Sequence, residues 1–448
     1  MNMKLWDKGI SINEQIEKFT VGRDREMDLF LAGPDVMGTI AHCIMLGKVG
    51  LLSSNELHTL RIALSEIYRE IGEGGFLIEE GIEDVHSQVE YNLTKRLGDI
   101  GKKVHSGRSR NDQVLVDLRL FTRDSLITLS QSVKKLFDVL QVQSETYKNV
   151  LLPGYTHLQI AMPSSFGLWF GAWAEALTDD MLVLQSAFNI NNQNPLGSAA
   201  GYGSSFPIDR RLTTQLLGFD DLNYNVVYAQ MSRGKVERII AFALSNLAAT
   251  LSRMANDLCL YMSQNFNFIS LPTELTTGSS IMPHKKNPDI FELIRARCNR
   301  IQALPFEITM TMNNLPSGYF RDMQLIKESF LPVFDEMESI LELATFMIKN
   351  VIVNESILDD PKYNNLFSVE AVNEAVLQGV PFRDAYKMLG QQIADGTFSP
   401  SKQLNHTHEG SIGNLCNEDI HRKFEAVYAS FAATKFDEVK KALIEYPG

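Results

Sequence analysis

Residues 111–141 read NDQVLVDLRLFTRDSLITLSQSVKKLFDVLQ, and this stretch decides the fold class. No proline or glycine occurs between residues 108 and 152. Its apolar side chains recur every three or four residues, the period that places them on one face of an α-helix. The face consists of Leu115, Leu118, Thr122, Leu126, Leu129, Val133, Leu136 and Leu140. The stretch therefore predicts one long helix with a buried stripe.

Residues 235–271 and 333–360 also lack proline and glycine, and we predict long helices there too. The stripe of the first is Val236, Ile240, Ala243, Leu247, Leu251, Met254, Leu258 and Tyr261. Further apolar residues lie off the two stripes, among them Leu120, Phe121, Ile127, Ile239 and Phe242. Because more than one face must then be covered, the pattern favours a bundle of long helices, extended by association of identical subunits.

The fold class is mainly α, because period-two alternation is short wherever it occurs. Residues 164–188 read as another helix, with small residues that permit close packing. Glycines interrupt the chain before residue 105, and loop-forming stretches recur after about residue 355. We predict an N-terminal helical domain (1–104), a central long-helix bundle (105–355) and a small C-terminal helical domain (356–448).

The charge balance excludes some partners. The 448 residues include 42 Lys and Arg against 54 Asp and Glu, a formal charge of −12, which disfavours unspecific binding to nucleic acid or anionic membrane. The four cysteines are scattered, as is typical of a reducing compartment. The N-terminal stretch lacks the apolar run of a secretion signal, and no uncharged apolar segment reaches the roughly 18 residues of a membrane span. We expect a soluble, cytoplasmic protein.

A basic cluster stands out in this acidic chain: GSSIMPHKKNPD, residues 278–289. A helix pattern follows it, with Asn287 suited to the cap, Pro288 to the first helical position and Asp289 to the first turn. A helix N-terminus attracts anions, and Lys285 and Lys286 add positive charge. The alternative is a solvated basic loop that only caps its helix.

Three distant segments offer complementary chemistry. HSGRSRNDQ (105–113) brings Arg108, Arg110 and Asn111 to a helix start, GYTHLQIAMP (154–163) presents a Thr-His pair between helices, and SGYFRDMQLIK (317–327) adds Tyr319, Gln324 and Lys327. Arginine forks, lysines and amides together suit a small molecule with several carboxylates. Walker and Rossmann glycine loops and HExxH are absent from the sequence, and His406 with His408 supplies too few ligands, so we expect no metal and no organic cofactor.

These motifs carry a family resemblance. GSSIMPHKKNPD resembles the signature of the aspartase/fumarase superfamily of lyases, while HSGRSRNDQV and GYTHLQIAMP are similar to its argininosuccinate lyase branch. EDVHSQVE (83–90) and NLPSGYFRDMQ (314–324) match in the same order along the chain. The resemblance implies a three-domain helical fold, a homotetramer whose active sites each draw on three subunits, and the splitting of argininosuccinate into arginine and fumarate, the last step of arginine biosynthesis.

The resemblance also implies roles for individual residues. Ser279 matches the general base, His157 the histidine of the acid chemistry and Glu292 its carboxylate partner, while Lys285 joins them in holding the carboxylate on which charge develops. The matches to the substrate pocket are Arg110, Asn111, Thr156 and Asn287 for the fumarate half, Asp24 and Asp28 near the arginine half, Tyr319, Gln324 and Lys327 for the rest of the substrate, and His86.

Other interpretations stay open. Asp24 stands where the family commonly has serine, and His284 where it commonly has glutamine, so recognition of the arginine end is less well defined. Glu292 could instead pair with Arg295 on the helix surface, and either His86 or His157 could be structural. The rival functions are those of fumarase, aspartase and adenylosuccinate lyase, or a non-catalytic structural role on the same fold.

Overall fold

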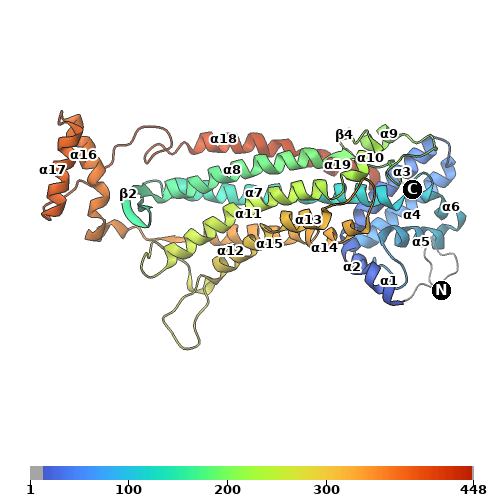
Figure 1. Ribbon diagram of the computed structural model, residues 1–448, viewed down its shortest axis with the longest axis horizontal. Coiled ribbons are helices and arrows are strands. Elements are labelled where there is room, and N and C mark those ends of the chain that lie inside the picture. The colour runs from blue at the N-terminus through green and yellow to red at the C-terminus, as the bar shows by residue number, and fades with distance from the viewer. Residues whose placement is uncertain (1–13, 446–448) are drawn as a thin grey trace.

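The computed structural model describes residues 14–445 of the chain. Most of the N-terminal stretch in which we looked for a secretion signal therefore lies outside the described residues. Within them the fold is mainly α, as predicted, and it is elongated: a bundle of long helices runs through the middle, with smaller helices at both ends (Figure 1).

The N-terminal helices form a head at one end of the bundle (Figure 1). Its elements are α1 (Glu14–Val21), α2 (Asp24–Met27), η1 (Asp28–Leu31), α3 (Ala32–Lys48), α4 (Ser54–Gly72), α5 (Val85–Leu97), α6 (Asp99–Lys102) and η2 (Lys103–His105). By length and composition the helical stretch Lys18–Lys48 could cross a membrane, but 72% of its apolar window is buried inside the fold. We read it as a core helix.

The bundle contains the long helices that the sequence predicted. They are α7 (Arg110–Thr146), α8 (Phe166–Asn191), α11 (Lys235–Met262) and α15 (Val333–Lys349), together with α12 (Asp289–Ile301), the helix expected after the basic loop. The shorter elements are α9 (Arg210–Leu216), α10 (Val226–Met231), η3 (Thr273–Leu275), α13 (Leu304–Met312), η4 (Arg321–Gln324) and α14 (Ile326–Phe330). Every member of the α7 stripe is buried, as is every member of the α11 stripe except the half-buried Tyr261.

Three helices end earlier than we predicted. The chain turns after Thr146, after Met262 and after Lys349, and each turn leads into a short strand. Freedom from proline and glycine permits a helix, but pairing with a neighbouring segment can outweigh that local tendency. The start of α7 is better specified, since the side chain of Ser109 and that of Asp112 form a reciprocal capping box.

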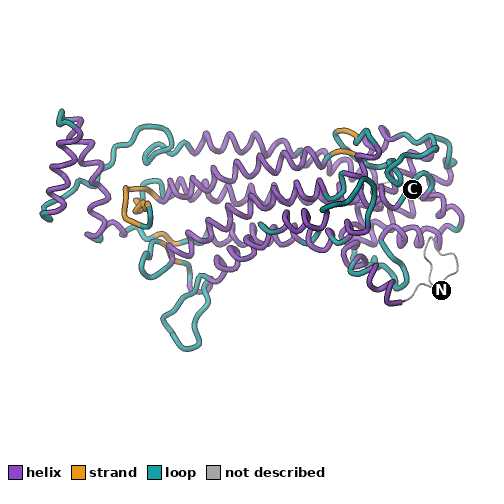
Figure 2. The backbone as a smooth tube through the Cα atoms, viewed as in Figure 1, coloured by secondary structure: helices purple, strands orange, loops and turns teal. Residues whose placement is uncertain are grey.

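Three small two-stranded sheets close the ends of the bundle, which the weak alternation of the sequence did not reveal (Figure 2). They pair β1 (Leu151–Thr156) with β2 (Gln159–Ser165), β3 (Gln193–Asn194) with β4 (Asp221–Leu222), and β5 (Ile269–Ser270) with β6 (Ile352–Val353). The first is an antiparallel hairpin in which Pro153 lies opposite Pro163. Because proline breaks a helix interior, these two residues oppose helical continuation on both sides of the turn.

The C-terminal elements divide between the two ends of the molecule. They are η5 (Ile357–Asp359), η6 (Pro361–Phe367), α16 (Ser368–Leu377), α17 (Phe382–Ala394), α18 (Asn417–Tyr428), η7 (Ala429–Phe431) and α19 (Ala433–Ile444). Helices α16 and α17 stand beyond the hairpin end, while α18 and α19 run back along the bundle toward the head (Figure 1). Phe424 of α18 stacks on Phe137 of α7, with ring centroids 3.9 Å apart. The boundaries of the three domains stay a prediction.

A buried carboxyl group in the bundle provides a test of the packing. Asp180 of α8 is 2% exposed and accepts a hydrogen bond of 2.6 Å from Asn246 of α11. Burial raises its pKa to about 7. Since an unfolded Asp has a pKa of about 4, the folded chain retains a proton that the unfolded chain releases, so Asp180 reduces stability increasingly as pH rises from about 4 to about 7.

We expect Asp180→Asn to raise the melting temperature at pH 8, with a smaller gain at pH 5, because the amide cannot lose a proton. Thermal unfolding of both proteins, followed by circular dichroism at the two pH values, measures the difference. An equal shift at both values, or a loss at pH 8, would contradict the buried, proton-binding state of Asp180.

Candidate active site

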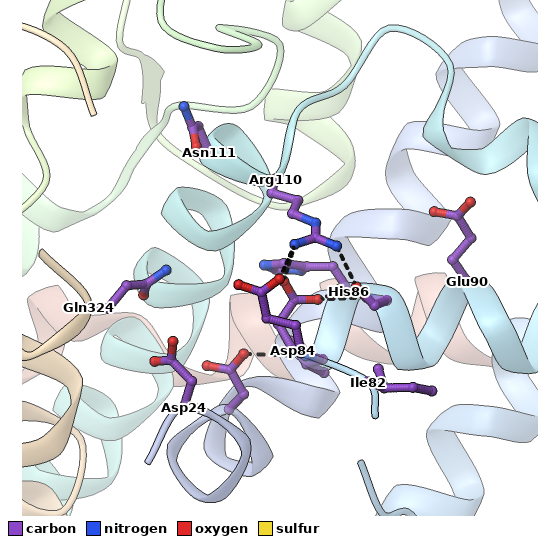
Figure 3. A network of polar contacts seen from close by, with 12 residues as sticks. Asp24, Ile82, Asp84, His86, Glu90, Arg110, Asn111 and Gln324 are labelled. Carbon is purple, nitrogen blue, oxygen red and sulfur yellow. Dashed lines mark hydrogen bonds and ion pairs between the residues drawn. The ribbon is translucent and has the colours of Figure 1, made fainter. Parts of the chain in front are cut away.

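The predicted site residues lie in three places within one chain. The head end of the bundle holds Asp24, Asp28, His86, Arg110, Asn111, Tyr319, Gln324 and Lys327. The turn of the β1–β2 hairpin holds Thr156 and His157, and the loop before α12, with the first turn of that helix, holds Ser279, Lys285, Asn287 and Glu292. Figure 3 shows the head cluster, with Asp24, Asp84, His86, Arg110, Asn111 and Gln324 around one region.

At the head, one ammonium group joins two carboxylates. Lys327 Nζ lies 2.8 Å from Asp24 Oδ1 and 2.6 Å from Asp28 Oδ1, and all three side chains are buried. Burial alone would lower the pKa of Lys327, but the charges of Asp28 and Asp24 outweigh it and raise that pKa. The lysine is therefore charged, and this part of the head cluster carries two carboxyl groups for one ammonium group.

Arg110, the first residue of α7, points back to the start of α5. Its guanidinium lies 3.1 Å from a carboxylate oxygen of Asp84 and 3.2 Å from one of Glu83, and it donates a hydrogen bond of 2.8 Å to the hydroxyl of Ser87. An anion bound at this place would use the remaining N–H donors of Arg110, since the guanidinium carries five. Asn111 follows on α7 and lies near this cluster (Figure 3).

His86 is buried between two carboxyl groups. Its Nδ1 lies 2.7 Å from Asp35 Oδ1 and 3.5 Å from Asp117 Oδ2. Burial alone would lower the pKa of His86, but Asp35 raises it. Burial and the neighbouring Asp35 raise the pKa of Asp117 well above its usual range. His86 is therefore buried and held by Asp35, and its place in the cluster is that of a support rather than of a group free to meet a ligand.

The segment that contains η4 contributes amide and phenol groups. Gln324 donates a hydrogen bond of 2.9 Å to the hydroxyl of Tyr319, and Arg233 of the bundle donates one of 3.4 Å to the amide oxygen of Gln324. Arg233 also binds the carbonyl of Met323 at 3.0 Å. Contact with a buried arginine fixes the orientation of Gln324.

The sequence suggested that the Thr-His pair lies between helices. In the structure the pair lies at an exposed turn instead. Thr156 ends β1, and His157 and Leu158 form the turn with φ values of 55° and 57°. A positive φ costs free energy in residues other than glycine, and residues with this conformation are frequent at functional sites. Both members of the pair are exposed, so within one chain the imidazole faces solvent.

The basic loop projects away from the bundle (Figure 2). The hydroxyl oxygen of Ser279 accepts hydrogen bonds from the backbone amides of Ile281 and Met282, at 3.4 and 3.2 Å. Lys286 donates one of 2.8 Å to Thr273, and Asn287 one of 3.2 Å to the carbonyl of Gly278. The loop thus holds its own shape and presents its cations outward.

The helix after the loop begins one residue later than predicted. Pro288 takes the cap position and Asp289 the first helical one, so Asn287 is no helix cap; its side chain binds within the loop instead. Arg295 donates to Asn256 at 3.0 Å, which gives the arginine a partner other than Glu292. Glu292 lies exposed in the first turn of α12.

The length of α7 keeps the head and the hairpin apart. Its 37 residues span about 55 Å at 1.5 Å per residue. Arg110 begins this helix, while Thr156 and His157 lie beyond its other end, beside β2 in Figure 1. A small molecule therefore cannot contact Arg110 and His157 of the same chain.

Two groups in the described range could offer three ligand atoms to a metal ion. One is Asp35, His86 and Asp117. The other is Asp138, His421 and Glu425, where the ammonium of Lys134 already lies within 2.9 Å of both carboxylates. His406 binds Ser411 and Glu370 through its two ring nitrogens. That the protein needs no metal stays a prediction.

The sequence analysis did not identify several polar residues of the site. They are Glu83, Asp84, Asp35, Asp117 and Arg321. Glu83 and Asp84 stand in the EDVHSQVE motif, of which we assigned only His86. Asp117 follows Arg110 by seven residues, a spacing that returns to the same face of a helix and could have linked the two.

Comparisons with known proteins agree on one family. A family model described as lyase matches residues 10–303. The argininosuccinate lyase of Parabacteroides distasonis is 62% identical over 444 residues, covering 99% of this chain and 100% of its own. That of Thermotoga neapolitana is 38% identical, covering 88% and 98%.

Solved structures share the fold at low sequence identity. An EDDS lyase in complex with formate superposes with a TM-score of 0.75 at 19% identity, covering 97% of this chain and 95% of its own. A class II fumarase from Schistosoma mansoni gives 0.71 at 17% identity, covering 93% and 94%. The mainly α lyase architecture is therefore common to all three proteins.

The buried lysine makes a testable contribution to stability. Lys327→Met would leave the carboxylates of Asp24 and Asp28 buried without their cation, and removing one partner of a buried ion pair costs about 3–5 kcal/mol. We expect a loss of this order in the free energy of unfolding by urea. Lys349→Met, at an exposed site on α15, is the control and should change stability little. Equal losses in the two variants would contradict the role of the buried cluster.

Proposed function

The chain belongs to the argininosuccinate lyase family, and we propose that it performs this family's reaction, the elimination of fumarate from argininosuccinate to leave arginine, in the cytoplasm. The observation that carries the assignment to particular residues is the basic loop. In it a serine hydroxyl, two lysines and the start of α12 occur within a dozen residues.

Ser279 is the general base of the proposed reaction. A serine hydroxyl is a weak base unless its alkoxide is stabilised. The amides of Ile281 and Met282, which already donate to its oxygen, would bind the negative oxygen more strongly, because a hydrogen bond to an ionised acceptor is about twice as strong as a neutral one. Lys285 and Lys286 add positive charge nearby. These contacts favour proton removal by Ser279.

The elimination proceeds through a carbanion. Ser279 takes a proton from the carbon next to a carboxylate of the succinyl part, and the electron pair spreads onto that carboxylate. Lys285 and Asn287 hold this carboxylate, while Arg110, Asn111 and Thr156 bind the rest of the fumarate half. The electron pair then forms the double bond of fumarate while the bond to the guanidinium nitrogen breaks. Donors aimed at developing charge contribute on the order of 10² to 10³ in rate each.

His157 and Glu292 serve the departure of arginine. The nitrogen that leaves must gain a proton, and an imidazole is the side chain best suited to deliver one near neutral pH. A carboxylate hydrogen-bonded to the imidazole would orient the ring and stabilise its charged form. Glu292 lies one turn into α12, so it would reach the site together with the loop.

The head cluster receives the arginine half. Asp24 and Asp28 offer carboxylates to the cationic groups of the substrate, and Lys327 offers its charge to a carboxylate. Tyr319 and Gln324, already hydrogen-bonded to each other, supply further polar contacts, and His86 supports the cluster through Asp35.

We propose that three copies of the chain supply one active site, within a homotetramer. The about 55 Å length of α7 excludes a site made by one chain from both Arg110 and His157. Large apolar side chains on the bundle surface support association, since soluble monomers rarely expose such patches. They include Leu182, Val183, Phe242, Phe306, Met310, Leu343 and Phe346.

Ser279→Ala tests the assignment of the base. We expect the turnover number to fall by at least about 10²-fold, because a positioned base contributes about 10² to 10⁴. The assembly should remain intact on gel filtration. Release of fumarate, followed by its ultraviolet absorbance, measures turnover. The control is Ser280→Ala, an adjacent exposed hydroxyl whose loss should have little effect. Normal turnover of Ser279→Ala would remove this residue from its role.

Mixed assemblies test whether chains share a site. If Ser279 and His157 of one site come from different chains, a mixture of Ser279→Ala and His157→Asn subunits contains some sites in which both are intact. After the two inactive variants are dissociated together and reassembled, we expect activity well above that of either variant treated alone. If both residues come from the same chain, mixing the two variants will restore no activity.

A further inference from the structure

Glu83 joins two arginines that come from different parts of the chain. One of its carboxylate oxygens lies 3.2 Å from Arg110 at the start of α7, and the other 2.8 Å from Arg321 at the start of η4. Its side chain is 10% exposed, whereas Arg321 is 46% exposed. A single carboxylate thus connects the segment with Arg110 and Asn111 to the segment with Tyr319 and Gln324.

Arg321 extends the connection to the N-terminal helices. Its guanidinium donates hydrogen bonds of 2.9 and 2.7 Å to the carbonyl oxygen of Thr20, at the end of α1. Asp24 follows four residues later in α2. Three segments that each carry proposed substrate contacts therefore meet through Arg321 and Glu83.

The charges at this junction favour a permanent link. Burial alone would raise the pKa of Glu83, but the hydrogen bond from Arg321 and the charge of Arg110 outweigh it, and the pKa lies below its usual range. The carboxylate stays ionised through the neutral range. Charge-assisted hydrogen bonds to arginine are short and directional, which suits a positioning role.

We propose that Glu83 is a positioning residue for substrate binding: its carboxylate, held between Arg110 and Arg321, sets the spacing between the start of α7 and the segment 319–327. This inference rests on the proposed function and adds a residue to it. Glu83 acts through the two arginines, so its loss should weaken binding of the whole substrate more than it slows the chemical step, which occurs at the loop and the hairpin of other copies.

Glu83→Gln is the test, with KM and kcat measured separately. Hydrogen bonds to charged groups contribute about 1.5–3 kcal/mol, which corresponds to a change of about 10- to 100-fold in KM. We expect KM to rise by this order, with kcat changed by less than about threefold, the pattern of lost uniform binding. Glu80→Gln is the matched control, because it removes the same charge from an exposed residue of the same loop and should leave KM unchanged.

A double-mutant cycle separates positioning from general damage. Arg321→Gln alone should raise KM by a similar factor. If Glu83 acts through Arg321, the double variant should be little worse than either single one, because residues in one network are not additive. Arg321 is half exposed, so its variant provides the test even if Glu83→Gln fails to fold.

The outcomes are distinct. An unchanged KM in folded Glu83→Gln overturns the inference, as do additive effects in the cycle or an unchanged KM in Arg321→Gln. A fall in kcat with constant KM overturns it too, since that would place Glu83 in the chemical step. If the unaltered protein releases no fumarate from argininosuccinate, the proposed function fails, and this inference with it.

Discussion

The length of one helix governs the rest of this molecule. Helix α7 runs without interruption for 37 residues, because its stripe of leucines is buried along the whole bundle and no proline or glycine breaks it. A helix of about 55 Å keeps its two ends apart, whatever conformation the connecting loops adopt. The residues that the proposed function brings to one substrate lie at opposite ends of this helix, so that proposal requires more than one copy of the chain.

The charged residues of the head and those of the basic loop have different surroundings. At the head, charged groups compensate one another inside the chain: Lys327 with Asp24 and Asp28, Arg110 with Glu83 and Asp84. In these pairs each charged group has a partner of opposite charge close by in the same chain. The loop of residues 278–289 lies in solvent, where its cations keep their hydration until a ligand replaces it. The charged groups of the head are therefore compensated within the chain, whereas the lysines of the loop remain exposed.

Local patterns predicted the elements better than their ends. The stripes of α7 and α11 were confirmed at every position except the half-buried Tyr261, since a period of three or four leaves little freedom about which face is buried. The predicted ends of these helices were wrong by several residues, because the chain beyond them pairs as strands, in a local hairpin after α7 and with a distant segment after α11. Asn287 was taken for a helix cap, but its side chain binds Gly278 across the loop, a contact that sequence neighbours do not reveal.

The sequence by itself determined the fold class, the two buried stripes and the family, since each depends on residue types at fixed spacings along the chain. It could also name Ser279, His157 and Lys327, whose roles stay a prediction. Only the tertiary structure decided which of these residues lie close together. Glu83 and Arg321 are 238 positions apart in the sequence, yet their side chains form a hydrogen bond of 2.8 Å. No spacing rule predicts that pair, because distances between remote segments depend on how whole helices pack.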